Sequence, residues 1–314
     1  MDEDSAVIPS APAEVTPRWL SRVLSTGDRA VEVSDVDVTA VGTGQTGATY
    51  RIRATYAGGA ESLPDSFIVK LPSQEADVRE RVALSYRSEH AFYTEVADTV
   101  AVPLPRCHYC AIGHDGADFV LLLADMAPAE QADQIRGCTE AEARLAVTAL
   151  AGLHGPRWCD PDWLTFAGTV MPKPDAAPAR GLGDIALLAA ETTIERLGAR
   201  MSAADTATVL ESAALIGDWL LSAPDRFSLL HGDYRADNLL FDPERTRVTV
   251  VDWQTLAVGL PARDLAYFIA TSLTPDERAV SERDLVGRYH EALTAHWVSG
   301  YDRETCWQDY LLGM

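Results

Sequence analysis

The chain has 314 residues, of which 47% are hydrophobic and 8% aromatic, so it can bury a sizeable core and is long enough for two lobes. Its 26 Lys and Arg against 47 Asp and Glu give a formal net charge of −21, which argues against nucleic acid and anionic membranes as partners. No apolar run reaches the ~18 residues of a membrane span, and the acidic start Met1-Asp2-Glu3-Asp4 is unlike a secretory signal, so we expect a cytoplasmic protein.

The first part of the chain is predicted to be rich in β-strands. Residues 1–30 read as a proline-containing arm and a short helix, which Thr16 caps and Pro17 begins. Beyond them, apolar side chains recur near period two, which is typical of strands. The strands are expected near residues 31–41, 50–56, 67–71 and 119–123, with a helix over 79–97 before the last of them.

The pattern changes near residue 126, after which helical periodicity dominates. The helices are expected over residues 139–154, 184–200, 204–222 and 281–298. A β-hairpin signature over 228–253 interrupts them. A β-rich first part followed by a helical second part predicts two lobes with a cleft between them.

A glycine motif lies between two of the predicted strands. Gly42, Gly44 and Gly47 match GxGxxG, which is a weak signal when it stands alone. A dinucleotide-binding fold needs this motif to open a helix, but strand-forming residues such as Thr49 and Tyr50 follow it here. A glycine loop between strands lets the backbone approach phosphate groups where side chains would collide. The motif indicates a phosphate-binding loop, with an ordinary hairpin turn and a Rossmann oxidoreductase as alternatives.

Lys70 ends the apolar run over residues 67–69, where a lone ammonium would be costly to desolvate. It therefore needs an anionic partner, and kinases pair such a lysine, which holds the α- and β-phosphates, with a glutamate on a helix. The candidates are Glu75, Glu80, Glu89 and Glu95. We select Glu89, because its neighbours Phe92 and Tyr93 can press that helix onto the sheet. The alternative is a lysine that extends to solvent, with Glu89 on a solvated face.

The strongest motif is H-x-D-x-x-x-x-N, formed by His231, Asp233 and Asn238, and Asp252 follows at the end of the apolar run 248–251. If the strand after Asn238 pairs with 248–251 so that Asn238 directly faces Asp252, an amide oxygen and a carboxylate can share Mg²⁺. Asp233 stands at the start of the loop, where it can accept the proton of an attacking hydroxyl. The alternative, in which Asp233 and Asn238 only cap a turn, explains neither the spacing nor the terminal acid.

Together these motifs resemble the aminoglycoside phosphotransferase superfamily, and most closely its ecdysteroid-kinase-like (CHK kinase-like) branch. The matching segments are residues 42–47, 68–70, Glu89 with Phe92 and Tyr93, 153–158, 231–238, 252–254, 261–265 and 304–310. The resemblance implies an α+β, bilobal, protein-kinase-like fold with a β-rich N-lobe and a mainly helical C-lobe. We expect an arm and short helix at 1–30, a nucleotide-binding N-lobe at 31–126 and a catalytic and substrate-binding C-lobe at 127–314.

The resemblance also implies a role for each matching residue. The catalytic base would be Asp233, and the Mg²⁺ ligands would be Asn238 and Asp252. The phosphates would be held by Gly42, Gly44, Gly47 and Lys70, the last paired with Glu89. The catalytic loop would be braced by His231 and Asp264, and the adenine would be held at a hinge over 121–126 that includes Leu123 and Asp125.

Departures from the family pattern narrow the expected activity. Residues 252–254 read Asp-Trp-Gln in place of the Asp-Phe-Gly of protein kinases, and no Ala-Pro-Glu segment follows, which favours a small-molecule kinase. We expect Mg²⁺-dependent transfer of the γ-phosphate of ATP, or of GTP, to a small hydroxylated acceptor bound among the helices at 155–225 and 265–314. The alternative is a nucleotide-binding pseudokinase. The chain ends at 311–314, where relatives are expected to continue in a further helix, and the sequence assigns no oligomeric state.

Overall fold

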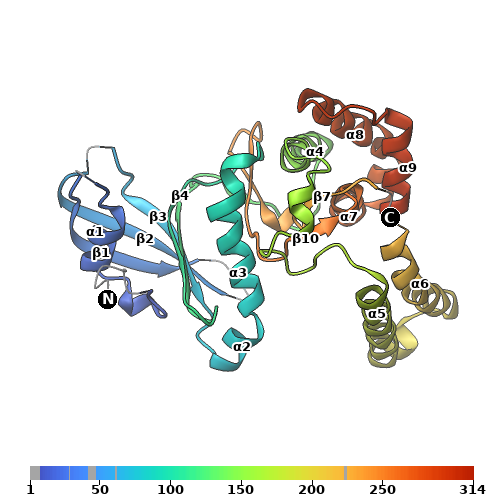
Figure 1. Cartoon of the computed structure of the whole chain (residues 1–314), viewed down its shortest axis with the longest axis horizontal. Coiled ribbons are helices and arrows are strands. Elements are labelled where there is room, and N and C mark those ends of the chain that lie inside the picture. The colour runs from blue at the N-terminus through green and yellow to red at the C-terminus, as the bar shows by residue number, and fades with distance from the viewer. Residues whose placement is uncertain (1–7, 28, 42–46, 61, 223–224) are drawn as a thin grey trace.

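The computed structural model describes residues 8–27, 29–41, 47–60, 62–222 and 225–314 of the chain. Figure 1 shows two parts side by side: a β-sheet flanked by α1 (Pro17–Leu24) and α3 (Ala83–Ala91), and a mainly helical part. This is the α+β arrangement, with a β-rich N-lobe and a mainly helical C-lobe, that the sequence predicts. α3 stands between the sheet and the helical lobe, so it can carry side chains to the junction.

The N-lobe is built on one antiparallel sheet in the strand order β1-β2-β3-β5-β4. Its strands are β1 (Glu32–Ala40), β2 (Gly47–Gly58), β3 (Ser66–Pro72), β4 (Cys107–Ile112) and β5 (Phe119–Ala124). Because side chains alternate along a strand, Phe67 and Val69 of β3 pack with α1, whereas Ile68 packs on the α3 side. Lys70 shares the face of Ile68 and therefore projects toward α3.

The N-terminal helix α1 begins as the sequence predicts. The hydroxyl of Thr16 accepts a hydrogen bond from the Trp19 amide at 3.2 Å, and Pro17 occupies the first helical position. A 3₁₀ turn over Pro12–Glu14 precedes it. Trp19 and Leu20 are buried against the sheet, so this helix forms one wall of the N-lobe core.

The helix expected over 79–97 is divided into shorter pieces. α2 (Ala76–Arg81) ends at Val82, whose φ of −103° and ψ of 12° separate it from α3. After α3 the chain widens into a π-helical turn over Phe92–Val96, before a 3₁₀ turn. Phe92 stacks there on Trp253 of the C-lobe, with ring centroids 3.7 Å apart. The change of winding thus coincides with a packing contact between the lobes.

Helices of the C-lobe surround a core that includes two small sheets. The helices are α4 (Glu140–His154), α5 (Ala176–Leu197), α6 (Ala203–Leu221), α7 (Ala262–Ser272), α8 (Pro275–Ala295) and α9 (Arg303–Gly313). One sheet pairs β7 (Ser228–Leu230) with β10 (Ala257–Gly259), and the other has the order β6-β8-β9, from β6 (Glu130–Gln131), β8 (Leu239–Phe241) and β9 (Val248–Val250). Both sheets end near the loop that carries Asp233, which fixes that loop on buried supports.

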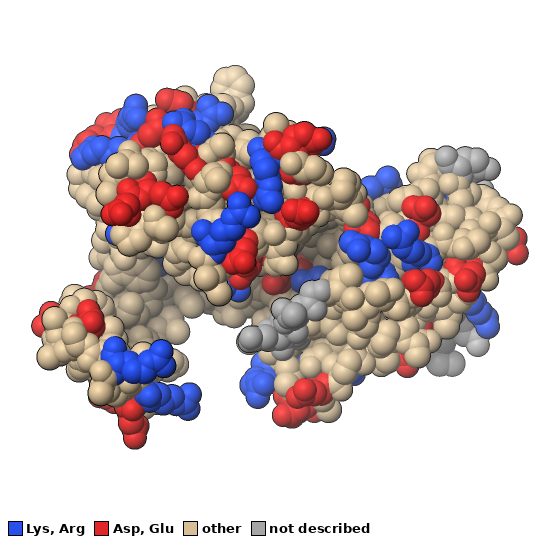
Figure 2. Space-filling view, turned by 180° about the vertical axis from the view of Figure 1, so that it is seen from behind, with Lys and Arg blue, Asp and Glu red and all other residues tan. Residues whose placement is uncertain are grey.

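α5 and α6 pack on one another and project from the remainder of the C-lobe (Figure 1). Seen from behind in Figure 2, the surface is hollowed beside this projection, and acidic and basic side chains are intermixed over the helical lobe. Within the described part of the chain, none of the helices is long and apolar enough to cross a membrane.

The register expected between β8 and β9 is wrong by one residue. Leu239 pairs with Val250 and Phe241 with Val248, so the Asn238 carbonyl accepts from the Val251 amide at 3.0 Å, and Asn238 does not face Asp252. The turn sets this register, because the Asp242 carboxylate accepts from the amides of Thr246 and Arg247 at 2.7 and 2.8 Å. Asp252 therefore lies beyond the ladder, as one of the few non-glycine residues with positive φ, at 70°.

Candidate active site

Three charged side chains from distant parts of the chain meet between the lobes. Nζ of Lys70 lies 2.7 Å from Oε1 of Glu89, on α3, and 3.1 Å from Oδ1 of Asp252, which follows β9. The ion pair that the sequence predicts between Lys70 and Glu89 is therefore present. Burial would lower the pKa of Lys70, but the Asp252 and Glu89 carboxylates outweigh burial and raise it, so the ammonium is charged at neutral pH.

Glu89 is fully buried, and its carboxylate is surrounded by donors. Oε1 accepts from Lys70 and, at 3.4 Å, from the Trp253 amide, while Oε2 accepts from Nε2 of Gln254 at 3.2 Å. Burial raises the pKa of Glu89, and the Lys70 ammonium opposes this change. These contacts tie α3 of the N-lobe to the segment that carries Asp252.

Asp252 is the most exposed of the three, with 42% of its side chain accessible. Burial opposes its ionisation, but the nearby Lys70 ammonium is stronger and holds the pKa of the Asp252 carboxyl below its usual range. The group is therefore a carboxylate at neutral pH. Its Oδ1 faces Lys70, which leaves Oδ2 available to a ligand in the cleft.

Asp233 lies in the loop between β7 and β8, with 30% of its side chain exposed. Its Oδ1 accepts from the Tyr267 hydroxyl at 3.1 Å. Its Oδ2 accepts from Nε of Arg235 at 3.2 Å and from Nδ2 of Asn238 at 3.1 Å. Three donors from two elements thus fix the direction of one partly exposed carboxylate.

His231 and Asp264 hold the base of this loop. The Asp264 carboxylate accepts from the amides of His231 and Gly232 at 2.6 and 3.1 Å. Burial lowers the pKa of His231, so its ring is neutral. Nδ1 then accepts from the Asp233 amide at 3.3 Å, and Nε2 donates to the Val251 carbonyl at 3.1 Å. The ring therefore connects the Asp233 loop to the residue that precedes Asp252.

Asn238 presents an amide oxygen at the same end of the hairpin. Its Nδ2 donates to the Asp233 carbonyl at 2.8 Å as well as to the Asp233 carboxylate, so Oδ1 is turned away from Asp233 and accepts from none of the described residues. Residues 8–27, 29–41, 47–60, 62–222 and 225–314 contain no group of three His, Cys, Asp or Glu that could hold a metal. The available donors for a cation are the hard oxygens of Asn238 and Asp252, a set that suits Mg²⁺ when phosphate oxygens complete the shell.

The glycine motif is described only at its last residue. Gly42 and Gly44 lie outside the described residues, which end before them at Val41 and resume at Gly47. Gly47 opens strand β2 and pairs with Pro72, so the motif leads into a strand rather than a helix. A Cβ at Gly47 would lie 3.1 Å from the Leu71 carbonyl oxygen, which favours glycine there.

Leu123 and Asp125, the two residues predicted to lie at a hinge, differ in whether their side chains are already engaged. Leu123 is a buried residue of β5, opposite Ile68 of β3. The Asp125 carboxylate is already engaged: Nε of Arg51 lies 2.7 Å from it, and the Ser66 hydroxyl and Ala127 amide donate to it at 2.5 and 3.0 Å. Despite partial burial, these donors lower the pKa of Asp125. Its carboxylate therefore stabilises the segment that follows β5.

Three residues of the site were not singled out from the sequence. Arg235 lies two residues after Asp233 inside the motif, and this position is the sequence feature that could indicate its place in the site. Gln254 directly follows the Asp252-Trp253 pair, but its contact with Glu89 depends on how the lobes meet. Tyr267 comes from α7 and has no local signal, because only the fold brings it to Asp233, 34 residues away.

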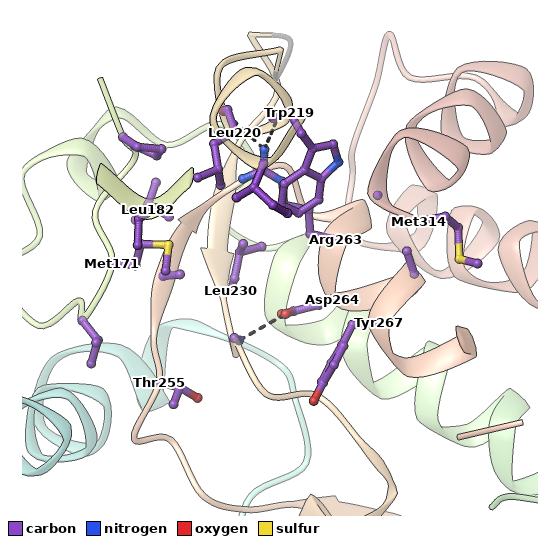
Figure 3. Close-up of a pocket in the computed structure, with 18 of the residues that line it drawn as sticks. Met171, Leu182, Trp219, Leu220, Leu230, Thr255, Arg263, Asp264, Tyr267 and Met314 are labelled. Carbon is purple, nitrogen blue, oxygen red and sulfur yellow. Dashed lines mark hydrogen bonds between the residues drawn. The ribbon is translucent and has the colours of Figure 1, made fainter. Parts of the chain in front are cut away.

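A cavity of about 660 Å³ adjoins the Asp233 loop, since Gly232 is one of its lining residues. Figure 3 shows Thr255 and Tyr267 at one end of it, and Trp219 and Arg263 at the other, with Leu230 between them. α7 supplies more of its described lining residues than any other element, and α6, β7 and β10 also contribute. Its lining falls partly in the ranges 155–225 and 265–314, where the sequence predicts an acceptor pocket, and partly outside them, as Leu230 and Arg263 do.

The bilobal fold and the paired Lys70 and Glu89 beside the His231–Asn238 loop define a protein of the kinase-like class. A model of the phosphotransferase enzyme family matches residues 37–309. The chain therefore belongs to the phosphotransferase enzyme family, which confirms its resemblance to aminoglycoside phosphotransferases.

Solved structures share the fold at low sequence identity. The chain is similar to choline kinase from Cryptosporidium parvum Iowa II, with 9% identity, a TM-score of 0.58, and coverage of 88% of this chain and 79% of that one. It is also similar to an aminoglycoside-3'-phosphotransferase of type VIII, with 16% identity, a TM-score of 0.50, and coverage of 88% and 92%. Among curated proteins, acyl-CoA dehydrogenase family member 10 of Mus musculus is 42% identical over 69 residues, which is 21% of this chain and 6% of that protein.

Proposed function

We propose that the protein is a magnesium-dependent kinase that transfers the γ-phosphate of ATP, or of GTP, to a hydroxyl of a small-molecule acceptor. The observation that carries the proposal is the contact of Lys70 with both Glu89 and Asp252 across the lobes. Phosphoryl transfer depends mainly on cations and on positioning around the phosphate oxygens. Membership of the phosphotransferase enzyme family supports the same reaction class.

In this proposal Lys70 binds the α- and β-phosphates, and Glu89 fixes the direction of its ammonium. The glycine motif, with Gly47 at its end, covers the phosphates with backbone amides. Because the Asp125 carboxylate is engaged by Arg51 and Ser66, we assign nucleobase binding at the hinge to backbone groups of residues 121–126, beside Leu123. The N-lobe at 31–126 is then the nucleotide-binding unit, and 127–314 carries catalysis and the acceptor, with 1–30 as an arm and short helix.

Asn238 and Asp252 are the residues that would hold Mg²⁺. When bound, the ion would neutralise part of the negative charge that spreads over the phosphate oxygens. Asn238 contributes its free Oδ1, because Nδ2 is committed to Asp233. Asp252 contributes a carboxylate that Lys70 keeps ionised. These groups differ from Asp233 in role, although all lie at one end of the hairpin.

Asp233 is the proposed catalytic base, which accepts the proton of the acceptor hydroxyl as the oxygen attacks phosphorus. Its carboxylate is partly exposed, and Tyr267, Arg235 and Asn238 orient it. His231 and Asp264 act on Asp233 only through the loop backbone, so they are positioning residues.

A pseudokinase that binds nucleotide without transfer is the alternative. A turnover assay distinguishes the pseudokinase from a kinase. Purified protein is mixed with γ-labelled ATP and a panel of alcohols, with Mg²⁺ or with excess chelator. Labelled phosphoester that forms only with Mg²⁺ and an acceptor supports the proposal. Nucleotide binding without phosphoester from any alcohol would support the pseudokinase.

A further inference from the structure

The cavity beside Asp233 has a polar end and an apolar wall. Gly232, Thr255 and Tyr267 line its polar end, and the Tyr267 hydroxyl donates to Asp233 at 3.1 Å. An acceptor hydroxyl that meets Asp233 therefore enters at this end, a step that rests on the proposed function. Beyond it the wall is formed by aliphatic side chains of Met171, Leu182, Ile216, Leu220, Leu230 and Val258.

The cavity offers little to a cationic acceptor. Asp264 is the carboxylate among its described lining residues, and both of its oxygens accept from the loop amides of His231 and Gly232. A polyamine or a quaternary ammonium would therefore be desolvated there without a free counter-charge, which is unfavourable.

The far end of the cavity carries a cation instead. The Arg263 guanidinium lies 4.2 Å from the centroid of the Trp219 ring, and Nη2 donates to the carbonyls of Trp219 and Leu220 at 3.1 and 3.3 Å. Nε of Arg263 is buried and has no hydrogen-bond partner among the described residues. No described carboxylate lies within the 4.0 Å of an ion pair with Arg263, in contrast to Arg226, whose partner Asp309 is 2.6 Å away.

Burial lowers the pKa of Arg263 to about 10, and no acid in the described part of the chain raises it again. The group nevertheless carries its charge at neutral pH. A largely buried guanidinium without an anion has lost solvation that carbonyl oxygens replace only in part. Among the described residues that line the cavity, Arg263 is therefore a cation that lacks a paired anion.

We propose that the phosphate acceptor is a hydroxylated organic acid, whose hydroxyl lies at Asp233, whose aliphatic body lies on the apolar wall, and whose carboxylate pairs with Arg263. Although Arg263 and Tyr267 are four residues apart on α7, Figure 3 shows them at opposite ends of the cavity, with Leu230 between them. The acid and the hydroxyl must therefore be separated by a chain or ring system rather than lie on adjacent carbons.

The direct test is binding, measured by calorimetry on the full chain with ω-hydroxyoctanoate, ω-hydroxydecanoate and ω-hydroxydodecanoate, each beside its uncharged amide. Wild-type protein is expected to bind at least one acid about 10–100-fold more tightly than its amide, the usual worth of a charge-assisted pair. In Arg263→Met that preference should disappear, while amide affinity is kept. Arg263→Lys should keep part of the preference, because it keeps the charge but loses the planar fork.

Arg283→Met is the matched control, because Arg283 lies 4.1 Å from the Trp307 ring centroid, on α8 and outside the cavity. It should leave the preference for the acid unchanged. If Arg263 serves only to cap the end of α6, Arg263→Met will weaken the acid and the amide equally, and the inference is overturned. Failure of every acid to bind, or equal binding of acid and amide to wild-type protein, overturns it too.

Binding and turnover separate this inference from the proposed kinase activity. Acid-selective binding without phosphoester formation keeps the Arg263 site and rejects the kinase. Phosphoryl transfer to neutral alcohols without acid selectivity keeps the kinase and rejects the Arg263 site.

Discussion

Nζ of Lys70 lies 3.1 Å from Oδ1 of Asp252, although 182 residues separate the two in sequence. Lys70 belongs to the sheet of the N-lobe, and Asp252 follows the hairpin of the C-lobe. Glu89 reinforces the junction, because its carboxylate accepts from Lys70 and from the Trp253 amide. The two lobes therefore meet through charged groups that a phosphate ligand would need.

Lys70→Met is expected to lower kcat/KM for the nucleotide by about 10–100-fold, since it removes a charge-assisted contact to phosphate. It also leaves Glu89 buried without its cation, so the variant should unfold at a lower denaturant concentration. The double variant Lys70→Met with Glu89→Gln removes both charges, and should recover stability but not activity. If the double variant recovers turnover, Lys70 does not bind phosphate.

Because the chain contains only Lys70 and Lys173, a lysine-reactive ATP analogue should label Lys70, as detected by mass spectrometry.

His231 should make stability depend on pH. Burial holds the pKa of the native ring below its ordinary 6.5, so the unfolded chain binds this proton more readily than the native protein does. The free energy of unfolding therefore falls as pH decreases below about 6.5, by at most about 1.4 kcal/mol per pH unit from this one group. The free energy of unfolding is measured in urea at several pH values between neutral pH and the native pKa. It should decrease less steeply with falling pH in His231→Asn than in wild-type protein. Equal slopes would mean that His231 titrates alike in both states.

Gly232 is a position where glycine is required for two reasons. Its φ is 78°, and a Cβ would overlap the Thr255 carbonyl oxygen. Gly232→Ala should lower the free energy of unfolding by more than the ~1–2 kcal/mol that left-handed backbone alone costs an L-residue. Gly300→Ala is the matched control, since Gly300 has a φ of 70° but no atom within 4 Å of an added Cβ. Comparable losses in the two variants would remove the steric part of the explanation.

Tyr267→Phe isolates the orientation of Asp233. The variant loses the hydrogen bond to Oδ1 and keeps the aromatic ring in the cavity wall. Turnover should fall about two- to tenfold, because Arg235 and Asn238 still orient the Asp233 carboxylate, with little change in KM for the nucleotide. Steady-state kinetics in both substrates measures this, and a change confined to nucleotide KM would contradict the assignment.

Much of the N-lobe follows from local pattern. The alternation around Lys70 predicts a buried strand, and a lysine on such a strand needs a carboxylate, which limits its partners to a few glutamates on the next helix. That reasoning predicts the Lys70–Glu89 pair, because the apolar pattern indicates which face of the strand and which face of the helix are buried. The break at Val82 is not readable, since nothing in its own residue type excludes a helix.

The C-lobe site shows what sequence pattern leaves open. The motif spacing predicts that Asp233, Asn238 and Asp252 share one hairpin, but the register depends on how Asp242 closes the turn, and the prediction was wrong by one residue. Tyr267 and Arg263 lie on α7 in an otherwise ordinary amphipathic helix. Their place in the cavity follows from the packing of α7 against α9, α8 and α4, which is not encoded locally.

The central claim is that Asp233 performs chemistry while Asp252 and Asn238 hold metal, and two variants measured together test it most directly. Calorimetry with a non-hydrolysable ATP analogue and Mg²⁺ is combined with turnover for Asp233→Asn and Asp252→Asn. Asp233→Asn should bind the nucleotide nearly as well as wild-type protein and turn over about 10²–10⁴-fold more slowly, the usual worth of general-base catalysis. Asp252→Asn should weaken Mg²⁺-nucleotide binding itself. If Asp233→Asn abolishes nucleotide binding while Asp252→Asn leaves it intact, the two roles are reversed and the account is contradicted.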